Sequence, residues 1–531
     1  VDGNDILADM TIGRISVRSE SEFNTVVSKI IGYEKLYAGS DWIESVALVG
    51  DPYDSGISTV ISNEYIAMIM ENYGVEDINE HYSGQGTFDN FMVDQLNEGV
   101  SFLDYRGFYG FSNFDENDIN QLNNGFMLPF LTTLTCGTGS FQSETSSDSE
   151  DLLRAGTVNN PKGAVAVVAT AQSYTHTAFN NIVTMGMYSG ILLYGAKTAG
   201  EALAYGQLAL ALAYPQNPND NVEHFSAWNN LMGDSATLLW TDTPRILVAD
   251  HADIVSSGDD FVDILVIDEN GDPVEGANVN LTSGTDTSSN SGIYTNETTD
   301  FSGHAYVPID DSFVGYTVDV TVTCQDCLYS ETSFLLNSDI VFPEVENSTI
   351  TSTEIGMGNG DGFINPGEST SISFNLLNNT GSDFSDLNIQ INSSDIYLSS
   401  ENIITISEIN SGETLLVEGL ILSIPPTILP DNKPLFFVNI SGNNASFESN
   451  QFLDLEIYSG TVSIHAEGNF SPGIITDFNI NLHNSGEINF SQLYGEILYG
   501  GNDLFFETET ISWNDIPTNS SSLTSNIQLS T

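Results

Sequence analysis

The chain has 531 residues, of which 73 are Asp or Glu and 10 are Lys or Arg, so its formal net charge at pH 7 is −63. A surface this acidic repels nucleic acids and anionic lipids, whereas it suits divalent cations and high salt. The length allows about three or four domains with cores of their own. No apolar run reaches the roughly 18 residues of a membrane span, so we expect a soluble chain whose export signal has been removed or lies outside it.

Up to about residue 255, short buried strands alternate with helical patterns. The apolar runs predict strands at 45–50, 100–105, 129–136 and 162–170, and helices at 63–73, 88–97 and 180–213. This order is typical of a parallel sheet covered by helices on both faces. Because the carboxyl ends of parallel strands meet at one edge, we expect the functional groups to gather there.

Beyond residue 255 the chain consists of short alternating runs separated by Asn, Ser, Thr, Asp and Gly. This texture predicts three immunoglobulin-like β-sandwiches, at 256–339, 340–458 and 459–531, after an α/β domain at 1–255. The segments 371–381 and 477–486 resemble each other, and the third module is short for its kind. Unpaired edge strands of such modules could join copies of the chain into an assembly.

Cys136 ends the buried run 129–136 and is followed by Gly137 and Gly139. Glycines at a strand end let a substrate approach the backbone, and the amides around Cys136 and Gly137 could hold a developing oxyanion. A thiol attacks only as the thiolate, so such a site needs a base, most often histidine. The plain alternative is an inert, partly buried cysteine.

The other two cysteines, Cys324 and Cys327, lie close together in Thr-Cys-Gln-Asp-Cys-Leu. They could form a local disulfide, which would leave Cys136 as the free thiol. This arrangement fits an exported protein.

The first 250 residues resemble the gingipain family of cysteine peptidases. The motifs that carry the resemblance are, in chain order, Ile12-Gly-Arg14, Val49-Gly-Asp-Pro52, Tyr105-Arg-Gly107, Cys136-Gly-Thr-Gly-Ser-Phe141, Lys162-Gly-Ala-Val-Ala166 and the closing segment 231–240. The resemblance implies a caspase-like α/β domain followed by an immunoglobulin-like domain, and a secreted or cell-surface location. It also implies a cysteine endopeptidase with Cys136 as nucleophile, whose domain lacks its N-terminal portion.

The base of the resembling family does not carry over. The family has a Gly-His-Gly element after the strand that precedes the nucleophile strand, but here the stretch reads Tyr105-Arg-Gly-Phe-Tyr-Gly110, with Phe108 at the histidine position. General-base assistance is worth about 100- to 10,000-fold, so we expect a weak or inactive peptidase. His176, which follows the next strand, is the candidate substitute base. Arg106 could lower the pKa of the thiol, but we expect it to pair with one of the many acids.

A Gly-rich loop in the second sandwich is the candidate metal site. Asn359, Asp361, Asn365 and Glu368, with a backbone carbonyl near Phe363, could surround Ca²⁺. The loop is similar to loops that begin many exported bacterial β-sandwich modules. A metal-free turn with Asx caps is the alternative.

Two functions follow from these observations. The first is a gingipain-like domain without its base, kept as a binding or structural unit on a stalk of β-sandwiches. The second is an active cysteine endopeptidase that uses Cys136 with His176. In both cases we expect the partners to be extracellular proteins or peptides, and neither nucleic acid nor membrane insertion.

Overall fold

The computed structural model describes residues 9–530, except 83–86, 144, 284–292, 310–312, 314, 339–340, 357–361, 395–401, 426–427, 429–432, 443–447, 459–461, 468–475, 487–488, 491–492, 497–504, 507–509 and 524–526. The chain divides into two compact units. The first contains residues 1–249, 266–278 and 321–331, and the second contains 250–265, 279–320 and 332–531.

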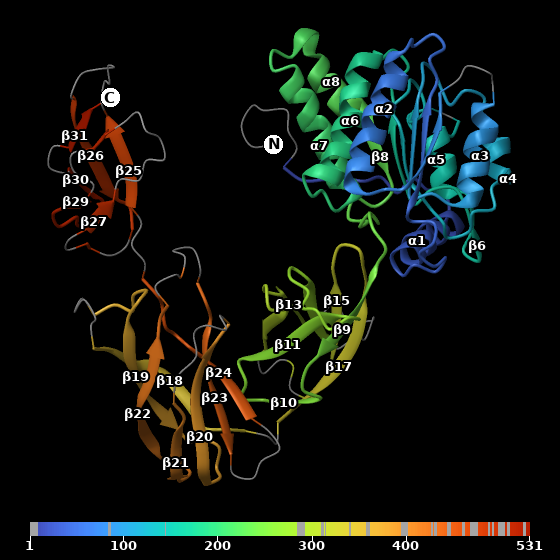
Figure 1. Cartoon of the computed structure of the whole chain (residues 1–531). Coiled ribbons are helices and arrows are strands. Elements are labelled where there is room, and N and C mark those ends of the chain that lie inside the picture. The colour runs from blue at the N-terminus through green and yellow to red at the C-terminus, as the bar shows by residue number, and fades with distance from the viewer. Residues whose placement is uncertain are drawn as a thin grey trace. The chain divides into compact units, whose positions relative to one another are not determined.

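The first unit is built on a six-stranded sheet with the strand order β2-β1-β3-β4-β7-β8 (Figure 1). The strands are β1 (Ser45–Gly50), β2 (Asp77–His81), β3 (Phe102–Arg106), β4 (Phe130–Thr133), β7 (Ala166–Thr170) and β8 (Asn229–Met232). The first five are mutually parallel, whereas β8 runs antiparallel to β7. The predicted helix-flanked α/β fold is therefore confirmed. The sheet is mixed rather than parallel throughout, because the edge strand β8 pairs antiparallel with β7.

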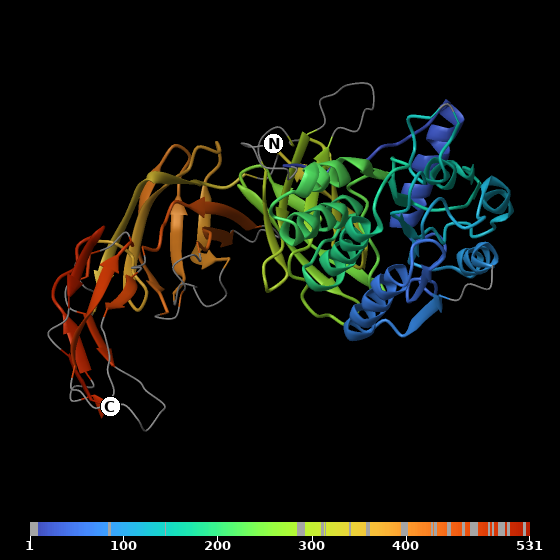
Figure 2. The same cartoon turned by 90° about the horizontal axis from the view of Figure 1, so that it is seen from above.

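Helices cover both faces of this sheet (Figures 1 and 2). On one face, Ile66, Met187 and Leu203 lie in one apolar cluster, and on the other Met92 and Leu153 lie in a second. Full burial of each such side chain stabilises the fold by about 1.5–3 kcal/mol. The helices of the domain are α1 (Glu20–Glu34), α2 (Ser58–Tyr73), α3 (Phe88–Glu98), α4 (Glu116–Gln121), α5 (Asp148–Arg154), α6 (Thr177–Leu193), α7 (Ala199–Ala213) and α8 (Asn221–Trp228), with the short pair β5 (Gly156–Thr157) and β6 (Asn160–Pro161) after α5.

The single helix expected at 180–213 is wrong: the structure has two helices, α6 and α7. The break falls after Tyr194, where Gly195 has a φ of +75°, a conformation that favours glycine. Thr198 then starts α7 through a capping box with Glu201. The apolar composition runs through both helices, so it hid the break.

The rest of the chain is made of strands. Those between residues 245 and 337 are β9 (Arg245–Asp250), β10 (Ile254–Ser256), β11 (Phe261–Asp268), β12 (Asn278–Ser283), β13 (Ile293–Thr298), β14 (His304–Pro308), β15 (Thr317–Thr323), β16 (Cys327–Leu328) and β17 (Ser330–Asn337). In the first unit β9 pairs with β16, and in the second β10 pairs with β17 and β11 with β14.

The second unit continues with two further groups of strands. A three-stranded sheet β18-β19-β22 and a four-stranded sheet β21-β20-β23-β24 share one core that includes Phe374, Ile389 and Val438, as in a β-sandwich. Their bounds are β18 (Glu344–Ile355), β19 (Ser369–Leu377), β20 (Phe384–Ser393), β21 (Ile404–Ile409), β22 (Thr414–Ser423), β23 (Phe436–Gly442) and β24 (Glu448–Leu453). The last group comprises β25 (Val462–Glu467), β26 (Thr476–Asn484), β27 (Leu493–Glu496), β28 (Phe505–Phe506), β29 (Thr510–Trp513), β30 (Ser520–Leu523) and β31 (Ile527–Ser530).

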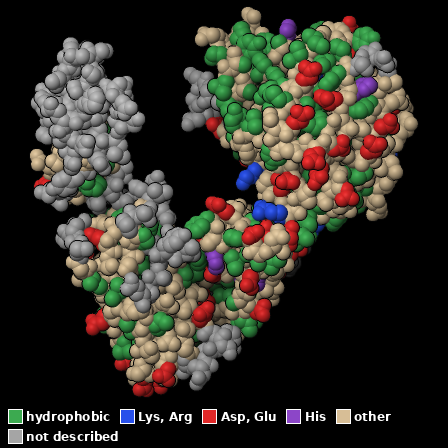
Figure 3. Space-filling view, in the orientation of Figure 1, with side chains coloured by type: hydrophobic (Ala, Val, Ile, Leu, Met, Phe, Trp, Pro, Cys, Tyr) green, Lys and Arg blue, Asp and Glu red, His purple; other side chains and the backbone are tan. Residues whose placement is uncertain are grey.

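The surface reflects the composition. Asp and Glu side chains are scattered over the face seen in Figure 3, where Lys and Arg are few. Within the described ranges, none of the helices combines the length and the apolar character that crossing a membrane requires.

Candidate functional site

Cys136 lies just beyond β4, at the carboxyl edge of the parallel strands. The segment after β3 runs beside it, with Tyr109 bridged to Cys136 and the Gly110 amide donating to the Cys136 carbonyl at 3.0 Å. On the other side, the Gly137 amide donates to the Gln172 carbonyl at 3.1 Å. Gly137 has a φ of +85°, which favours glycine at this turn. Because its amide is already bonded, Gly137 does not offer the free oxyanion donor that we expected from the sequence.

The neighbour of the thiol is a hydroxyl. The Cys136 sulfur lies 2.9 Å from Oγ1 of Thr175, in the loop after β7, and Cys136 is the free cysteine of the described chain. A threonine hydroxyl can exchange a hydrogen bond with a thiol but does not take up its proton near neutral pH. No pattern in the sequence marks Thr175 as part of the site, although this residue directly precedes the candidate base His176.

Phe108 lies beside this site but supplies no proton acceptor. It follows β3, the strand next to β4, and its side chain is 53% exposed, while that of Tyr109 is 65% exposed. Gly107 before it is tightly placed: an added Cβ would lie 2.3 Å from the Tyr105 hydroxyl. The segment after β3 therefore brings Phe108 to the edge of the sheet at which Cys136 lies.

His176 is engaged in starting helix α6. Its Nδ1 accepts the Ala178 amide at 3.1 Å, and its ring lies edge-on to Phe179. In this tautomer Nε2 carries the proton, so neither nitrogen is left as an acceptor. Among the described residues, the hydrogen-bond partner of the Cys136 sulfur is Thr175 rather than His176.

His81 is also remote from the thiol. It ends β2, which is separated from β4 by β1 and β3. Its ring stacks on Phe91 and meets Phe88 edge-on, with centroid distances of 4.9 and 5.0 Å. The ring is half-buried because α3 packs against it.

Arg106 holds the segment before Cys136 in place through hydrogen bonds. Its fully buried guanidinium donates to Oδ1 of Asn181 at 3.1 and 2.5 Å and to the Leu134 carbonyl, which also accepts from Asn180 at 2.9 Å. Asp104 is the acid whose charge acts on Arg106, whereas the hydrogen bonds of the guanidinium go to an asparagine of α6 and a carbonyl. Burial lowers the pKa of Arg106 to about 10, so the group stays charged near neutral pH. It thereby ties the residue two places before Cys136 to the helix.

Asp104 is a second buried charge in the same strand. Its Oδ1 accepts from the Thr132 hydroxyl, which also lies 3.0 Å from the Tyr188 hydroxyl. Oδ2 has no hydrogen-bond partner among the residues that the structure describes. Burial raises the pKa of Asp104 to about 7, against the opposing effects of the Thr132 hydrogen bond and the Arg106 charge. Burial therefore favours the neutral form of this carboxyl.

The candidate calcium loop is only partly covered by the structure. Asn359 and Asp361 lie outside the described residues. Asn365 is buried, and its side-chain amide donates to the Tyr458 carbonyl at 3.0 Å. The Glu368 carboxylate accepts the backbone amide of Asn365 at 3.2 Å, and the Phe363 ring packs on that of Tyr458. Over the described residues, no three or more His, Cys, Asp or Glu side chains gather as a metal site. Calcium binding therefore stays a prediction.

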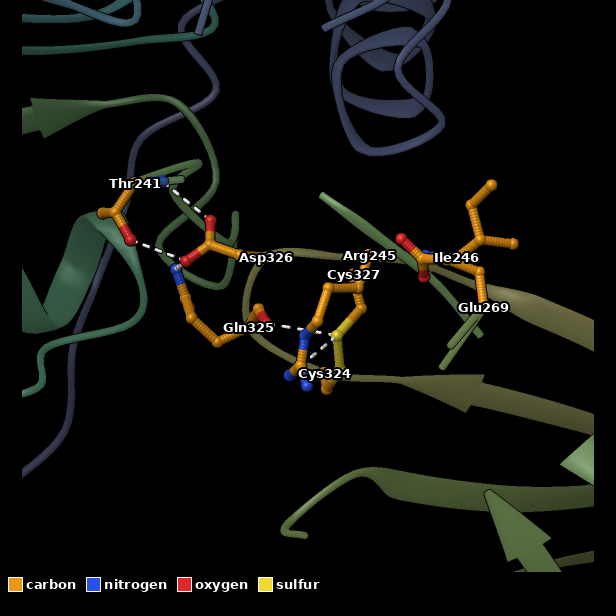
Figure 4. The surroundings of a disulfide bond; sticks show 8 residues. All are labelled: Thr241, Arg245, Ile246, Glu269, Cys324, Gln325, Asp326 and Cys327. Carbon is orange, nitrogen blue, oxygen red and sulfur yellow. Dashed lines mark hydrogen bonds between the residues drawn. A yellow bond between two sulfur atoms is a disulfide. The ribbon is translucent and has the colours of Figure 1, made fainter. Parts of the chain in front are cut away.

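Cys324 and Cys327 form a disulfide in the structure, within the short loop between β15 and β16 (Figure 4). The loop contacts the segment that follows β8 in the first unit. Its Asp326 accepts from the Thr241 amide at 2.7 Å.

Comparison with known proteins gives the site a context. Residues 1–240 match the model of peptidase family C25, and residues 247–308 match a domain of unknown function, DUF7382. Gingipain R2 of Porphyromonas gingivalis is 27% identical over 278 residues, which are 49% of this chain and 36% of the relative. Gingipain R1 of the same organism is 30% identical over 179 residues, 32% of this chain and 18% of the relative. The matched stretches thus cover 36% and 18% of the length of these two relatives.

The fold agrees with this result. The crystal structure of the Arg-specific cysteine proteinase gingipain R superposes with a TM-score of 0.54 and 20% identity, covering 63% of this chain and 77% of that one. At this identity the superposition shows the fold alone, while the family model rests on the sequence. Residues 1–240 therefore form a gingipain-like domain of peptidase family C25.

Proposed function

We propose that residues 1–240 form a secreted gingipain-like domain that has lost efficient peptidase activity and acts as a binding or structural unit. The observation that carries the proposal is the surroundings of the Cys136 sulfur. Its hydrogen-bond partner is the Thr175 hydroxyl, and Phe108 stands where the family has its base. Without a base the thiol must ionise unaided, at a cost of about 100- to 10,000-fold in rate.

Exposed rings at the same edge of the sheet support a binding role. Tyr53 follows β1, Phe108 and Tyr109 follow β3, and Tyr174 follows β7; these side chains are 61%, 53%, 65% and 90% exposed. Aromatic side chains on a surface contribute large contact area when a partner covers them. The partners would be extracellular proteins or peptides. A net charge of −63 repels nucleic acid but does not exclude protein partners.

The disulfide and the low content of Lys and Arg fit an extracellular protein. Disulfides such as Cys324–Cys327 persist in oxidising compartments. Lys and Arg are only 10 of 531 residues, so proteases that cut after basic residues find few sites. The strand-rich second unit would then carry the domain, and pairing of its edge strands between copies would be one route to assembly.

The test is labelling by a peptidyl chloromethyl ketone, which alkylates an activated thiol within a peptide-binding site. We expect slow labelling of the unmodified chain at neutral pH, none of Cys136→Ala, and at least tenfold faster labelling of Phe108→His. Rapid labelling of the unmodified chain that Cys136→Ala abolishes would refute the loss of activity.

A second candidate, an active endopeptidase with His176 as base, rests on one observation. His176 directly follows Thr175, the residue that contacts the sulfur, so a local rearrangement of the loop would bring its ring close. Peptide hydrolysis that falls at least 100-fold in His176→Gln, but not in the control His224→Gln, would establish this candidate. His224 lies on α8 and stacks on Trp228, outside the loop.

A further inference from the structure

The loop that contains the second and third cysteines is pinned to the segment that leaves the gingipain-like domain (Figure 4). Asp326 accepts from the Thr241 amide at 2.7 Å, from the Thr241 hydroxyl at 2.6 Å and from the Asp242 amide at 3.2 Å. The side chain of Gln325 donates to the Leu239 carbonyl at 2.5 Å. One short loop thus satisfies four polar groups of the segment 239–242.

The same loop also continues into strand pairing. The Asp326 carbonyl accepts the Arg245 amide at 3.0 Å, and Cys327 then pairs with Arg245 and Leu328 with Ile246. Asp326 has a φ of +50°, a left-handed conformation that Asp tolerates but does not prefer. The disulfide between the residues on either side of Gln325 and Asp326 restricts the loop to this turn.

The two sulfur atoms lie in different surroundings. Cys327 is 5% exposed, and a guanidinium nitrogen of Arg245 lies 3.7 Å from its sulfur. Cys324 is less buried. Both line a cavity of about 310 Å³ whose walls include Leu238, Trp240 and Tyr329. A small molecule in this cavity meets both cysteines, of which Cys324 is the more exposed and Cys327 the one beside the positive charge of Arg245.

We propose that Cys324 and Cys327 are a thiol-exchange site for a small external thiol, and that their disulfide locks the loop onto the segment 239–246. The thiolate of the external thiol attacks the Cys324 sulfur, a new S–S bond forms there, and the old bond breaks with its electron pair on Cys327. Arg245 stabilises the departing thiolate, since a better stabilised leaving thiolate leaves faster. A second external thiolate then attacks the sulfur of the first external thiol in the mixed disulfide and releases the Cys324 thiolate. The protein disulfide is reduced, two external thiols are oxidised to one disulfide, and the protein thiolates take protons from water.

Opening of the loop 324–327 can be followed by trypsin cleavage after Arg245. The bond after Arg245 is a trypsin site, and beyond it the only other Lys or Arg is Lys433. While Arg245 stays paired with Cys327 the bond is protected, because a protease needs the strand to open. Cleavage after the fully buried Lys29 reports unfolding of the whole domain instead.

The experiment uses the full chain with Cys136→Ala, so that only two cysteines react, and reduced glutathione as the thiol. We expect reduction to speed cleavage after Arg245 at least tenfold with no cleavage after Lys29. Asp326→Ala should reproduce the fast cleavage in the oxidised chain, whereas the neighbouring Asp242→Ala, whose carboxylate bonds only Thr243 among the described residues, should not. Equal cleavage of oxidised and reduced chains would overturn the lock.

The direction of attack is tested separately. Brief reaction of the native disulfide with reduced glutathione, quenched with acid, should give the mixed disulfide at Cys324 at least tenfold more often than at Cys327. Reduction of the native disulfide should slow about threefold in Arg245→Gln but not in Arg18→Gln, which removes the same charge at an exposed position. Equal amounts of the mixed disulfide at the two cysteines, or equal rates of reduction for the two arginine variants, would overturn the proposed chemistry.

Discussion

Replacement of Asn181 by alanine tests whether the buried arginine holds the nucleophile loop in place. Oδ1 of Asn181 accepts two guanidinium nitrogens of Arg106, at 3.1 and 2.5 Å, and Arg106 is fully buried. Each hydrogen bond to a charged group contributes about 1.5–3 kcal/mol, and an unpaired buried charge costs about 3–5 kcal/mol. Because the two bonds share one oxygen, we expect Asn181→Ala to lose about 3 kcal/mol of unfolding free energy.

The measurement must report on this domain alone, because the chain has two compact units. Pulse proteolysis with trypsin in increasing urea does so when cleavage after the buried Lys29 is followed. Asn181→Asp keeps the acceptor for Arg106 but loses the donor to the Ser58 carbonyl at 3.1 Å, so its stability should lie between those of the other two chains. The exposed control Asn160→Ala should stay within about 0.5 kcal/mol. A loss below about 1 kcal/mol for Asn181→Ala would refute the reasoning, since Arg106 would then not depend on this acceptor.

Three further predictions concern charge and metal. The folded pKa of Asp104 is raised from 3.8 to about 7, so the folded state binds the proton more tightly and the domain should lose stability as the pH rises from about 4 to 7, by at most about 4 kcal/mol. Asp104→Asn should lack that slope in urea unfolding, and an unchanged slope would assign it to other groups. The hydrogen bond that His304 donates to the Asp263 carboxylate raises the pKa of His304, so stability from this pair should be present below about pH 6.5 and fade as the pH rises through the raised pKa. Asp263→Asn should abolish this dependence in thermal unfolding. Calcium at 100 times its dissociation constant should stabilise the second unit by about 2.7 kcal/mol and raise its Tm, an effect that chelation reverses and Glu368→Gln weakens; an unchanged Tm would favour the metal-free turn.

The strands β1, β3, β4 and β7 could be predicted because each lies in a short, continuous apolar run with turn residues at both ends, whereas the polar edge strand β2, Asp-Ile-Asn-Glu-His, carries no such run. The run 45–50 became β1 with the same bounds, whereas β4 ends at Thr133, three residues before the predicted end at 136. The end of the apolar run does not mark the end of pairing, because Thr135 and Cys136 already turn toward the next segment. Helix ends were less predictable: α2 begins at Ser58 without a side-chain cap, five residues before the expected start.

The contacts of the site lay beyond the reach of sequence patterns. Arg106 and Asn181 are 75 positions apart, and only the packing of α6 on the sheet brings them together. Thr175 reaches Cys136 because the loop after β7 turns back over the loop after β4, through the bond from Gly137 to Gln172. Neither contact produces a recognisable spacing of residues in the sequence. The capping box of Thr198 and Glu201 does, and it could have predicted that the expected helix 180–213 is two helices.

The loop around Cys136 is supported without any help from the residue at the base position. Thr138, which is fully buried, donates its hydroxyl to the Thr133 and Thr135 carbonyls at 2.7 and 2.9 Å, and the Gly139 amide donates to the Thr170 carbonyl at 3.0 Å. None of these bonds involves Phe108, whose ring is more than half exposed. Restoring histidine there should therefore leave the thiol where it is, so the gain in labelling rate on Phe108→His measures proton transfer rather than repair of the loop. A gain that vanished because Cys136 had moved would show instead that the aromatic ring positions the thiol.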